Sequence, residues 1–187
     1  VDEVQQFVDD LKYRVKGIKE NASNIGTNMH SLCEDYITGK NPVEPTTEPL
    51  KTMFDKFKKF WKKRNFEIVE TEKTYYSDEL DVCGTLDVLV KRKGKVGILD
   101  FKTSKDFYPD MPVQIHTYKK LVEDSTKHKI EFLAVINIPK EPVKDVSIRF
   151  FDIKPRYLKA FKACKYLNTV EEDFKKRNEE YNKLRSK

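Results

Sequence analysis

Two short runs of sequence decide the fold. They are Gly84-Thr85-Leu86-Asp87-Val88-Leu89-Val90 and, a few residues later, Gly97-Ile98-Leu99-Asp100-Phe101-Lys102-Thr103-Ser104. Both runs are apolar and rich in β-branched residues, which predicts strands over 82–91 and 95–102. The charged, glycine-containing segment between them predicts a compact turn. The two strands therefore form a hairpin.

An aspartate interrupts each of these apolar strands. Because side chains alternate along a strand, Asp100 and Lys102 project from one face, while Leu99 and Phe101 project from the other. The hairpin allows Asp87 to approach the same face, and an unpaired ionised carboxylate there is costly to bury. Two carboxylates of this kind suit Mg²⁺ or Mn²⁺. The strand pattern alone leaves a plainer alternative open, in which Asp100 and Lys102 form a strand-end ion pair and Asp87 caps a turn.

Periodicity extends the assignment to the rest of the chain, as one α/β domain over residues 1–187. Upstream of the hairpin we expect a helix in 1–20, a break at 21–24, a short helix from about Gly26 to Gly39, a loop over 41–49, a helix over 50–64 and a strand over 66–76. Downstream we expect a helix that Asp110 caps, strands over 129–139 and 146–153, and a long helix over about 155–185.

Two of the expected helices carry polar pairs spaced four residues apart. His30 and Glu34 lie beside the apolar stripe of the second helix, and Gln114 and Tyr118 share a face of the helix that follows the hairpin. Each pair is ordinary by itself, since a single histidine on an apolar helix is usually structural. The order of these features along the chain is more specific than any one of them.

Taken in order, these motifs resemble those of a known family. The sequence is similar to the RecB-type branch of the PD-(D/E)xK nucleases over residues 24–139, through Gly26-x-x-x-His30 with Glu34, Gly84-x-x-Asp87, Asp100-x-Lys102-Thr103, and Gln114-x-x-x-Tyr118. The resemblance implies a restriction-endonuclease-like αβββαβ core with a mixed central sheet. The N- and C-terminal helices lie outside that core.

The same resemblance implies roles for individual residues. His30, Asp87 and Asp100 would be ligands of one or two Mg²⁺ or Mn²⁺ ions, with the Phe101 carbonyl as a further ligand. Lys102 would position or activate the attacking water. Catalytic roles would also fall to Gln114 and Tyr118, which would orient that lysine or the scissile phosphate, and Glu72 matches an acidic position of less settled role.

The implied activity is that of a metal-dependent deoxyribonuclease, most simply an exonuclease that acts on single-stranded DNA or DNA ends in replication, recombination or repair. A replication or recombination protein would then be a natural partner. Two alternatives stay open: a structure-specific or restriction-type endonuclease with the same site, and a non-catalytic DNA-binding subunit.

Several family features are absent from the sequence. Leu86 precedes Asp87 where the superfamily's name has proline, as is usual in this branch. Three scattered cysteines cannot supply the four-cysteine iron–sulfur cluster of some members, so we expect no such cluster. No phosphate-binding Gly-x-x-x-x-Gly-Lys-Ser/Thr loop occurs, which argues against a helicase motor in this chain.

The basic residues are concentrated in one segment. The chain carries 37 Lys and Arg against 31 Asp and Glu, a net charge of +6. Lys51–Arg64 contains seven of the basic residues and one acid, Asp55, so the rest of the chain is balanced. A polyanionic partner would therefore meet this helix first, through Lys58, Lys59, Lys62 and Lys63. A solvated face that keeps the protein soluble is the alternative. Thr103, Ser104 and Lys105, at the end of a strand, are also placed to touch phosphate oxygens.

The remaining composition bears on location. No apolar run approaches the 18 residues that a membrane-spanning helix needs, so we expect no membrane association. Odd, widely spaced cysteines favour free thiols in a reducing, intracellular compartment. That compartment would be the cytoplasm for a bacterial or phage protein, with a mitochondrial location left open. The start of the chain lacks both an initiator methionine and a signal or transit pattern, which leaves open a trimmed N-terminus.

Overall fold

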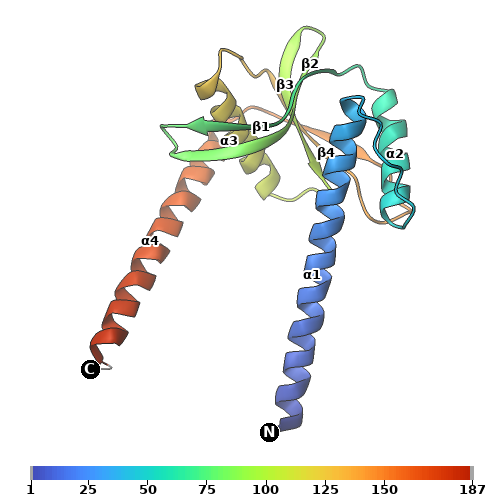
Figure 1. The fold of residues 1–187 in the computed structure, drawn as a ribbon. Helices are drawn as coiled ribbons and strands as arrows, with labels where there is room; N and C mark the ends of the chain where they lie inside the picture. Colours follow the sequence, from blue (N-terminus) through green and yellow to red (C-terminus); the bar gives the residue numbers. More distant parts are fainter. Residues whose placement is uncertain (1, 186–187) are drawn as a thin grey trace.

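The computed structural model describes the backbone of residues 2–185 and the side chains of residues 20–185. Helices and strands follow one another in an order that contains the expected helix, three strands, helix and strand (Figure 1). The elements are α1 (Asp2–Ile37), α2 (Leu50–Lys62), β1 (Glu67–Ser77), β2 (Val82–Arg92), β3 (Lys95–Lys102), α3 (Asp110–Ser125), β4 (Phe132–Asn137), β5 (Ser147–Phe151) and α4 (Pro155–Arg185).

The strands form one mixed five-stranded sheet in the order β1-β2-β3-β4-β5. Neighbouring strands are antiparallel except for β3 and β4, which are parallel and are connected through α3. A parallel pair needs such a crossover, because its strands start from the same edge of the sheet. The predicted mixed α/β class is therefore confirmed.

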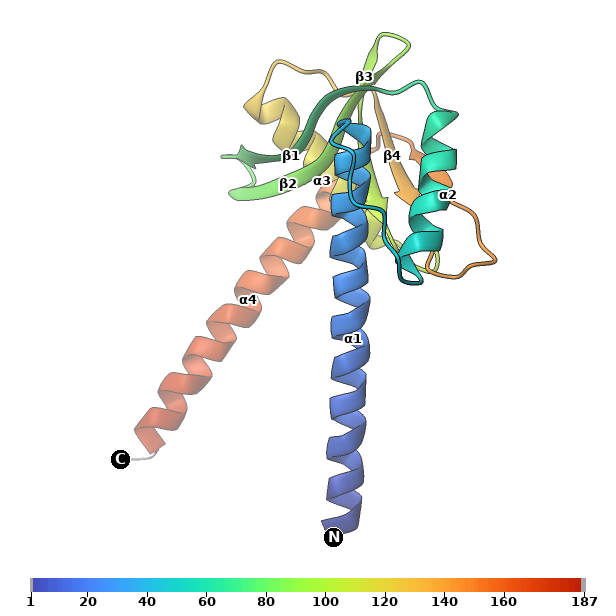
Figure 2. The ribbon, with the colours of Figure 1, turned by 45° about the vertical axis from the view of Figure 1, so that its right-hand side comes forward.

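Helices cover both faces of the sheet (Figures 1 and 2). On one face, α1 and α2 pack against a cluster that includes Phe57 of α2 with Leu99 and Phe101 of β3. On the other face, α3 and the base of α4 pack against a cluster that includes Ile98 and Val135. The predicted alternation along β3 is confirmed, so Asp100 and Lys102 belong to the face that α3 covers.

Two local predictions were wrong. The break expected at 21–24 does not occur, because α1 continues without interruption to Ile37 and ends before Gly39, at φ +76°. Asparagine and serine cost a helix only a few tenths of a kcal/mol each, and Asn21, Ser23 and Asn24 all lie in solvent. The cap expected from Asp110 is also absent, since Pro109 occupies the N-cap position and Asp110 is the first residue of α3.

The N-terminal part of α1 and most of α4 extend away from the sheet (Figures 1 and 2). Lys140, after β4, donates a hydrogen bond of 2.9 Å to the Ala22 carbonyl of α1. Lys162 of α4 forms an ion pair of 2.7 Å with Glu79, between β1 and β2. Beyond these two contacts, the N-terminal part of α1 and the C-terminal part of α4 extend away from the sheet and the helices that cover it (Figures 1 and 2). Within the described residues, none of the helices combines the length and the apolar character required to cross a membrane.

Candidate functional site

The candidate site lies where β2 separates from β3. Pairing between these strands begins at Val88 and Leu99, one residue after Asp87. In place of a strand-to-strand bond, Asp87 Oδ2 accepts a hydrogen bond of 2.6 Å from the Phe101 backbone N–H. The Asp87 carboxylate is thereby held against β3, and this contact fixes its position relative to Asp100.

Asp100 is the most deeply buried acid of the site, with 2% of its surface exposed. Its Oδ2 lies 2.7 Å from Lys102 Nζ, which confirms that the two side chains share a face. This contact is the ion pair that the plainer alternative predicted, and Oδ2 has no further hydrogen-bond partner among the described residues. Burial and the charge of Asp87 raise the pKa of Asp100 to about 6, against the opposing effect of Lys102. Burial and the charge of Asp87 therefore outweigh the effect of Lys102 on this carboxyl.

His30 approaches this cluster from α1. Its Nδ1 lies 3.5 Å from Asp87 Oδ1, and its ring meets Phe101 edge-on, with the ring centroids 6.1 Å apart. Burial lowers the pKa of His30, but the hydrogen bond and charge of Asp87, with the charge of Asp100, outweigh burial and raise it overall. Both carboxylates therefore favour the protonated form of His30.

Glu72 faces the site from β1. The β1–β2 pairs Thr71–Val88 and Lys73–Leu86 flank it, which sets it opposite Asp87. Its backbone is left-handed, with φ +46°, a conformation that non-glycine residues adopt at a cost. Glu72 is largely exposed, and partial desolvation, then the charges of Asp87 and Glu34, raise its pKa. Backbone strain beside a cluster of carboxylates is typical of functional sites.

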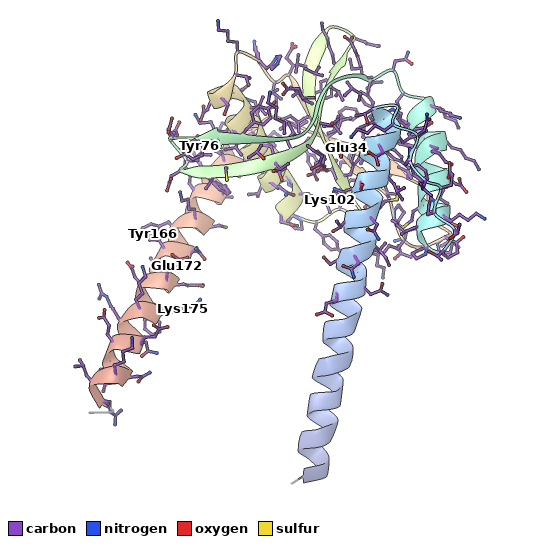
Figure 3. The ribbon with its side chains drawn as sticks, in the orientation of Figure 1. Glu34, Tyr76, Lys102, Tyr166, Glu172 and Lys175 are labelled. Atoms are coloured by element: carbon purple, nitrogen blue, oxygen red, sulfur yellow. The ribbon has the colours of Figure 1, made fainter. Side chains whose placement is uncertain are left out.

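A pocket of about 480 Å³ opens between α1 and the β1–β2 hairpin. Its lining consists of Gly26, Thr27, His30, Ser31, Glu34, Glu72 and Asp87. Figure 3 shows Glu34 on α1 and Lys102 on β3, where the helix meets the sheet. Thr27 and Ser31 were not predicted. Their spacing relative to His30 and Glu34 was the available signal, because all four polar residues share one helical face.

Two glycines of the sequence motifs allow the elements to approach closely. A Cβ atom on Gly26 would lie 3.3 Å from Thr103 Oγ1, at the end of β3. A Cβ atom on Gly84 would lie 3.0 Å from Tyr118 Cε1 of α3. Because Gly26 has no side chain, α1 can pack closely against the end of β3. Gly84 likewise lets the Tyr118 ring pack against β2.

Gln114 and Tyr118 interact as their spacing predicted. Gln114 Nε2 donates a hydrogen bond of 3.0 Å to Tyr118 Oη. Burial and the charges of Asp100 and Asp87 raise the pKa of Tyr118 to about 12. The hydroxyl therefore stays protonated at neutral pH and is available as a hydrogen-bond donor.

The basic helix lies apart from this pocket, whose lining includes none of its lysines. Lys58 pairs with Glu44 at 2.7 Å and with Asp55 at 3.0 Å. Lys59 and Lys63 instead line a second pocket, of about 280 Å³, next to the loop between β4 and β5. Lys62 is exposed. The structure therefore does not bring the predicted DNA-contacting lysines of α2 to the carboxylates.

The residues after β3 lie in different environments. Ser104 Oγ already forms hydrogen bonds within the protein. It donates to the Asp106 carbonyl at 2.7 Å and to Asn137 Oδ1 at 3.2 Å. Lys105 is exposed, while Thr103 packs beside Gly26. Thr103 is therefore the one of the three that the structure brings next to α1 and its pocket.

The donor set fits a hard divalent cation, although no preformed cage is present. Among the described residues, no three His, Cys, Asp or Glu side chains stand close enough together to form a ready metal site. The observation that favours a cation is the buried Asp100 carboxylate, which has Lys102 as its one charged partner at Oδ2 and is acted on by the charge of a second carboxylate, Asp87. Carboxylate oxygens with one imidazole suit Mg²⁺ or Mn²⁺, and of these two Mn²⁺ accepts the nitrogen ligand more readily.

No protein-family model matches this chain, and comparison with curated proteins gives no match. The fold and the site define it as a mixed α/β protein with carboxylates, a histidine and a lysine gathered where two strands separate.

Proposed function

We propose that this protein is a metal-dependent nuclease with a restriction-endonuclease-like core, which hydrolyses phosphodiester bonds in DNA. The proposal rests chiefly on the buried carboxylate of Asp100, which is paired with Lys102 alone although the charge of Asp87 also acts on it. An ionised acid buried at this cost is expected where a cation will bind. The element order around it agrees with the core that the sequence motifs imply.

Asp87, Asp100 and His30 would hold the cation, which when bound polarises a phosphoryl oxygen and lowers the pKa of bound water. Lys102 has three N–H donors beside Asp100, and they position the attacking water and offset charge on the phosphate. Tyr118 donates a hydrogen bond toward the scissile phosphate, because Gln114 already occupies its acceptor side. Glu72 adds a further carboxylate to the pocket from β1.

The favoured substrate is single-stranded DNA or a DNA end, and the favoured activity is exonucleolytic. The reactive groups are recessed: Asp100 is buried, and α1 and the β1–β2 hairpin wall the pocket. A single strand reaches such a site more easily than an intact duplex does. A role in replication, recombination or repair inside the cell, with a partner protein from those processes, follows from this activity.

Cleavage assays with labelled single- and double-stranded DNA, linear and circular, test the proposal in Mg²⁺, Mn²⁺ or EDTA. We expect cleavage of linear single strands that requires the metal and is lost in Asp100→Ala. Asp78→Asn, which alters an exposed carboxylate after β1, is the matched control and should cleave normally.

Each other outcome has a defined meaning. Cleavage that persists in EDTA or in Asp100→Ala contradicts the metal mechanism. Degradation of closed circles replaces the exonuclease with an endonuclease that uses the same site. DNA binding without cleavage in either metal identifies a non-catalytic DNA-binding subunit.

A further inference from the structure

The long helix α4 exposes an unusual amount of apolar surface. None of its residues is buried. Six of its large side chains are between 48% and 74% exposed: Tyr166, Leu167, Val170, Phe174, Tyr181 and Leu184. Contiguous exposed apolar surface of this kind marks an interaction site in a soluble protein. The proposed nuclease activity does not account for it.

The apolar residues of α4 follow a heptad repeat. Steps of three and four residues alternate through Ala160, Ala163, Leu167, Val170, Phe174, Arg177, Tyr181 and Leu184, and Arg177 is the only polar member. This spacing of 3.5 residues keeps one stripe facing a partner helix along its whole length, as in coiled coils. The occupant that the stripe fits is therefore another helix with the same repeat.

The stripe faces away from the body of the protein. Leu158 and Phe161 pack against the core under α3, and Lys165 bonds to the Leu80 carbonyl and to the Asp81 carbonyl at the β1–β2 turn. At 100° per residue, these anchoring positions lie on the opposite side of the helix from the stripe. Figure 3 shows the part beyond the anchors, with Tyr166, Glu172 and Lys175 labelled along it. A second helix can therefore reach the stripe without displacing any contact of α4.

We propose that α4 pairs with α4 of a second copy of this chain, as a parallel, in-register coiled coil. Charges beside the stripe set the direction. In a parallel pair, Glu180 faces Arg185 of the second copy, five positions further along, and no like charges oppose each other at the flanking positions. In an antiparallel pair centred on the stripe, Asp173 faces Glu180 of the second copy, which is repulsive.

The surface available is enough for a specific dimer. Five of the six exposed residues lie on the stripe, namely Leu167, Val170, Phe174, Tyr181 and Leu184. Large side chains bury on the order of 100–200 Å² each when covered, so those of two copies present on the order of 1,000 Å². That is near the threshold for a specific interface, so we expect weak, micromolar association. In the parallel, in-register pair Arg177 faces Arg177 of the second copy, and this like-charge contact at the stripe lowers the stability of the dimer.

Light scattering coupled to gel filtration, over a range of micromolar concentrations, measures the oligomeric state. We expect a mass that rises toward twice the 22.1 kDa of the chain as concentration increases. Phe174→Glu should keep the protein at one chain, while Asn182→Glu, on the opposite side of the same helix, should leave the dimer unchanged. Circular dichroism establishes that both variants stay folded. A wild-type mass of one chain at every concentration, or a dimer that Phe174→Glu does not weaken, overturns the proposal.

Cross-linking tests direction and register. In a background with the exposed Cys83 and Cys164 replaced by serine, Val170→Cys should form an intermolecular disulfide on oxidation. The control Asn168→Cys, on the anchored side of α4, should form far less. In an antiparallel pair the two Val170 positions are far apart, so a dimer that fails to cross-link at Val170 contradicts the parallel arrangement. Either result is independent of nuclease activity.

Discussion

Replacing Asp100 by asparagine is expected to change the stability and the function of this protein in opposite directions. Asparagine keeps the size and shape of the side chain but removes the charge that burial and Asp87 make costly. We therefore expect Asp100→Asn to be more stable than the wild type at neutral and alkaline pH, and at the same time to lose metal binding and cleavage.

The magnitude follows from the pKa of Asp100. A rise from the ordinary value of 3.8 to about 6 means that ionising this group in the folded state costs roughly 3 kcal/mol. Because the folded pKa exceeds the unfolded one, the folded state binds the proton more tightly. Wild-type stability is therefore retained below about pH 4, falls as the pH rises through about 6, and stays low above that.

Asparagine escapes this penalty. The pKa of about 6 already includes the favourable effect of Lys102, so the loss of that ion pair is not a further cost. The gain expected at about pH 8 is therefore up to roughly 3 kcal/mol in the free energy of unfolding, and it should shrink to near zero at about pH 4.

Urea denaturation followed by circular dichroism, at both pH values and without divalent metal, measures this difference. Adding Mn²⁺ should then stabilise the wild type and leave Asp100→Asn unchanged, because ligand binding to the folded state shifts the unfolding equilibrium. A variant less stable than the wild type at pH 8, or a difference that does not depend on pH, would show that ionising the buried Asp100 carboxyl does not destabilise the fold. Equal stabilisation of both proteins by Mn²⁺ would remove Asp100 from the metal site.

Three further predictions follow from the geometry. Lys102→Ala should keep DNA binding but lower kcat by roughly 10²-fold or more, measured in steady-state cleavage assays, and unchanged turnover would exclude Lys102 from the chemistry. Glu72→Gly should raise the free energy of unfolding in urea relative to Glu72→Gln, by about 1 kcal/mol, because glycine relieves the left-handed backbone; a lower free energy of unfolding would contradict the strain. Replacing Lys59, Lys62 and Lys63 by glutamine should weaken single-strand binding and flatten the slope of log K against log salt by about 2, and an unchanged slope would identify a merely solvated face.

Local sequence predicted most of the secondary structure, because periodicity reflects which side of an element is buried. The alternation around Asp100 correctly assigned Leu99 and Phe101 to one core and Lys102 to the other face. The failures came where local preference is weak. Asn21 and Ser23 are poor helix formers, but a long helix with no proline tolerates them in solvent.

The candidate site was predicted in part. Four-residue spacing correctly paired Gln114 with Tyr118, because that contact lies within one helix. The left-handed backbone of Glu72 had no signal in its residue type, and the separation of the α2 lysines from the pocket depends on how α2 packs. Contacts of this kind depend on the relative placement of distant elements.

The sequence by itself determined the strands, the helix faces and the set of residues with chemical potential, because these depend on periods of two and 3.6 residues and on side-chain chemistry. The tertiary structure was needed to show that the pairing of β2 with β3 begins just after Asp87, that His30 of α1 approaches Asp87, and that Asp100 is buried with Lys102 as its ion-pair partner. The physical reason is that burial and electrostatic coupling depend on distances between elements far apart in the chain. Those distances set the burial and the pKa of Asp100, the features that favour a bound cation.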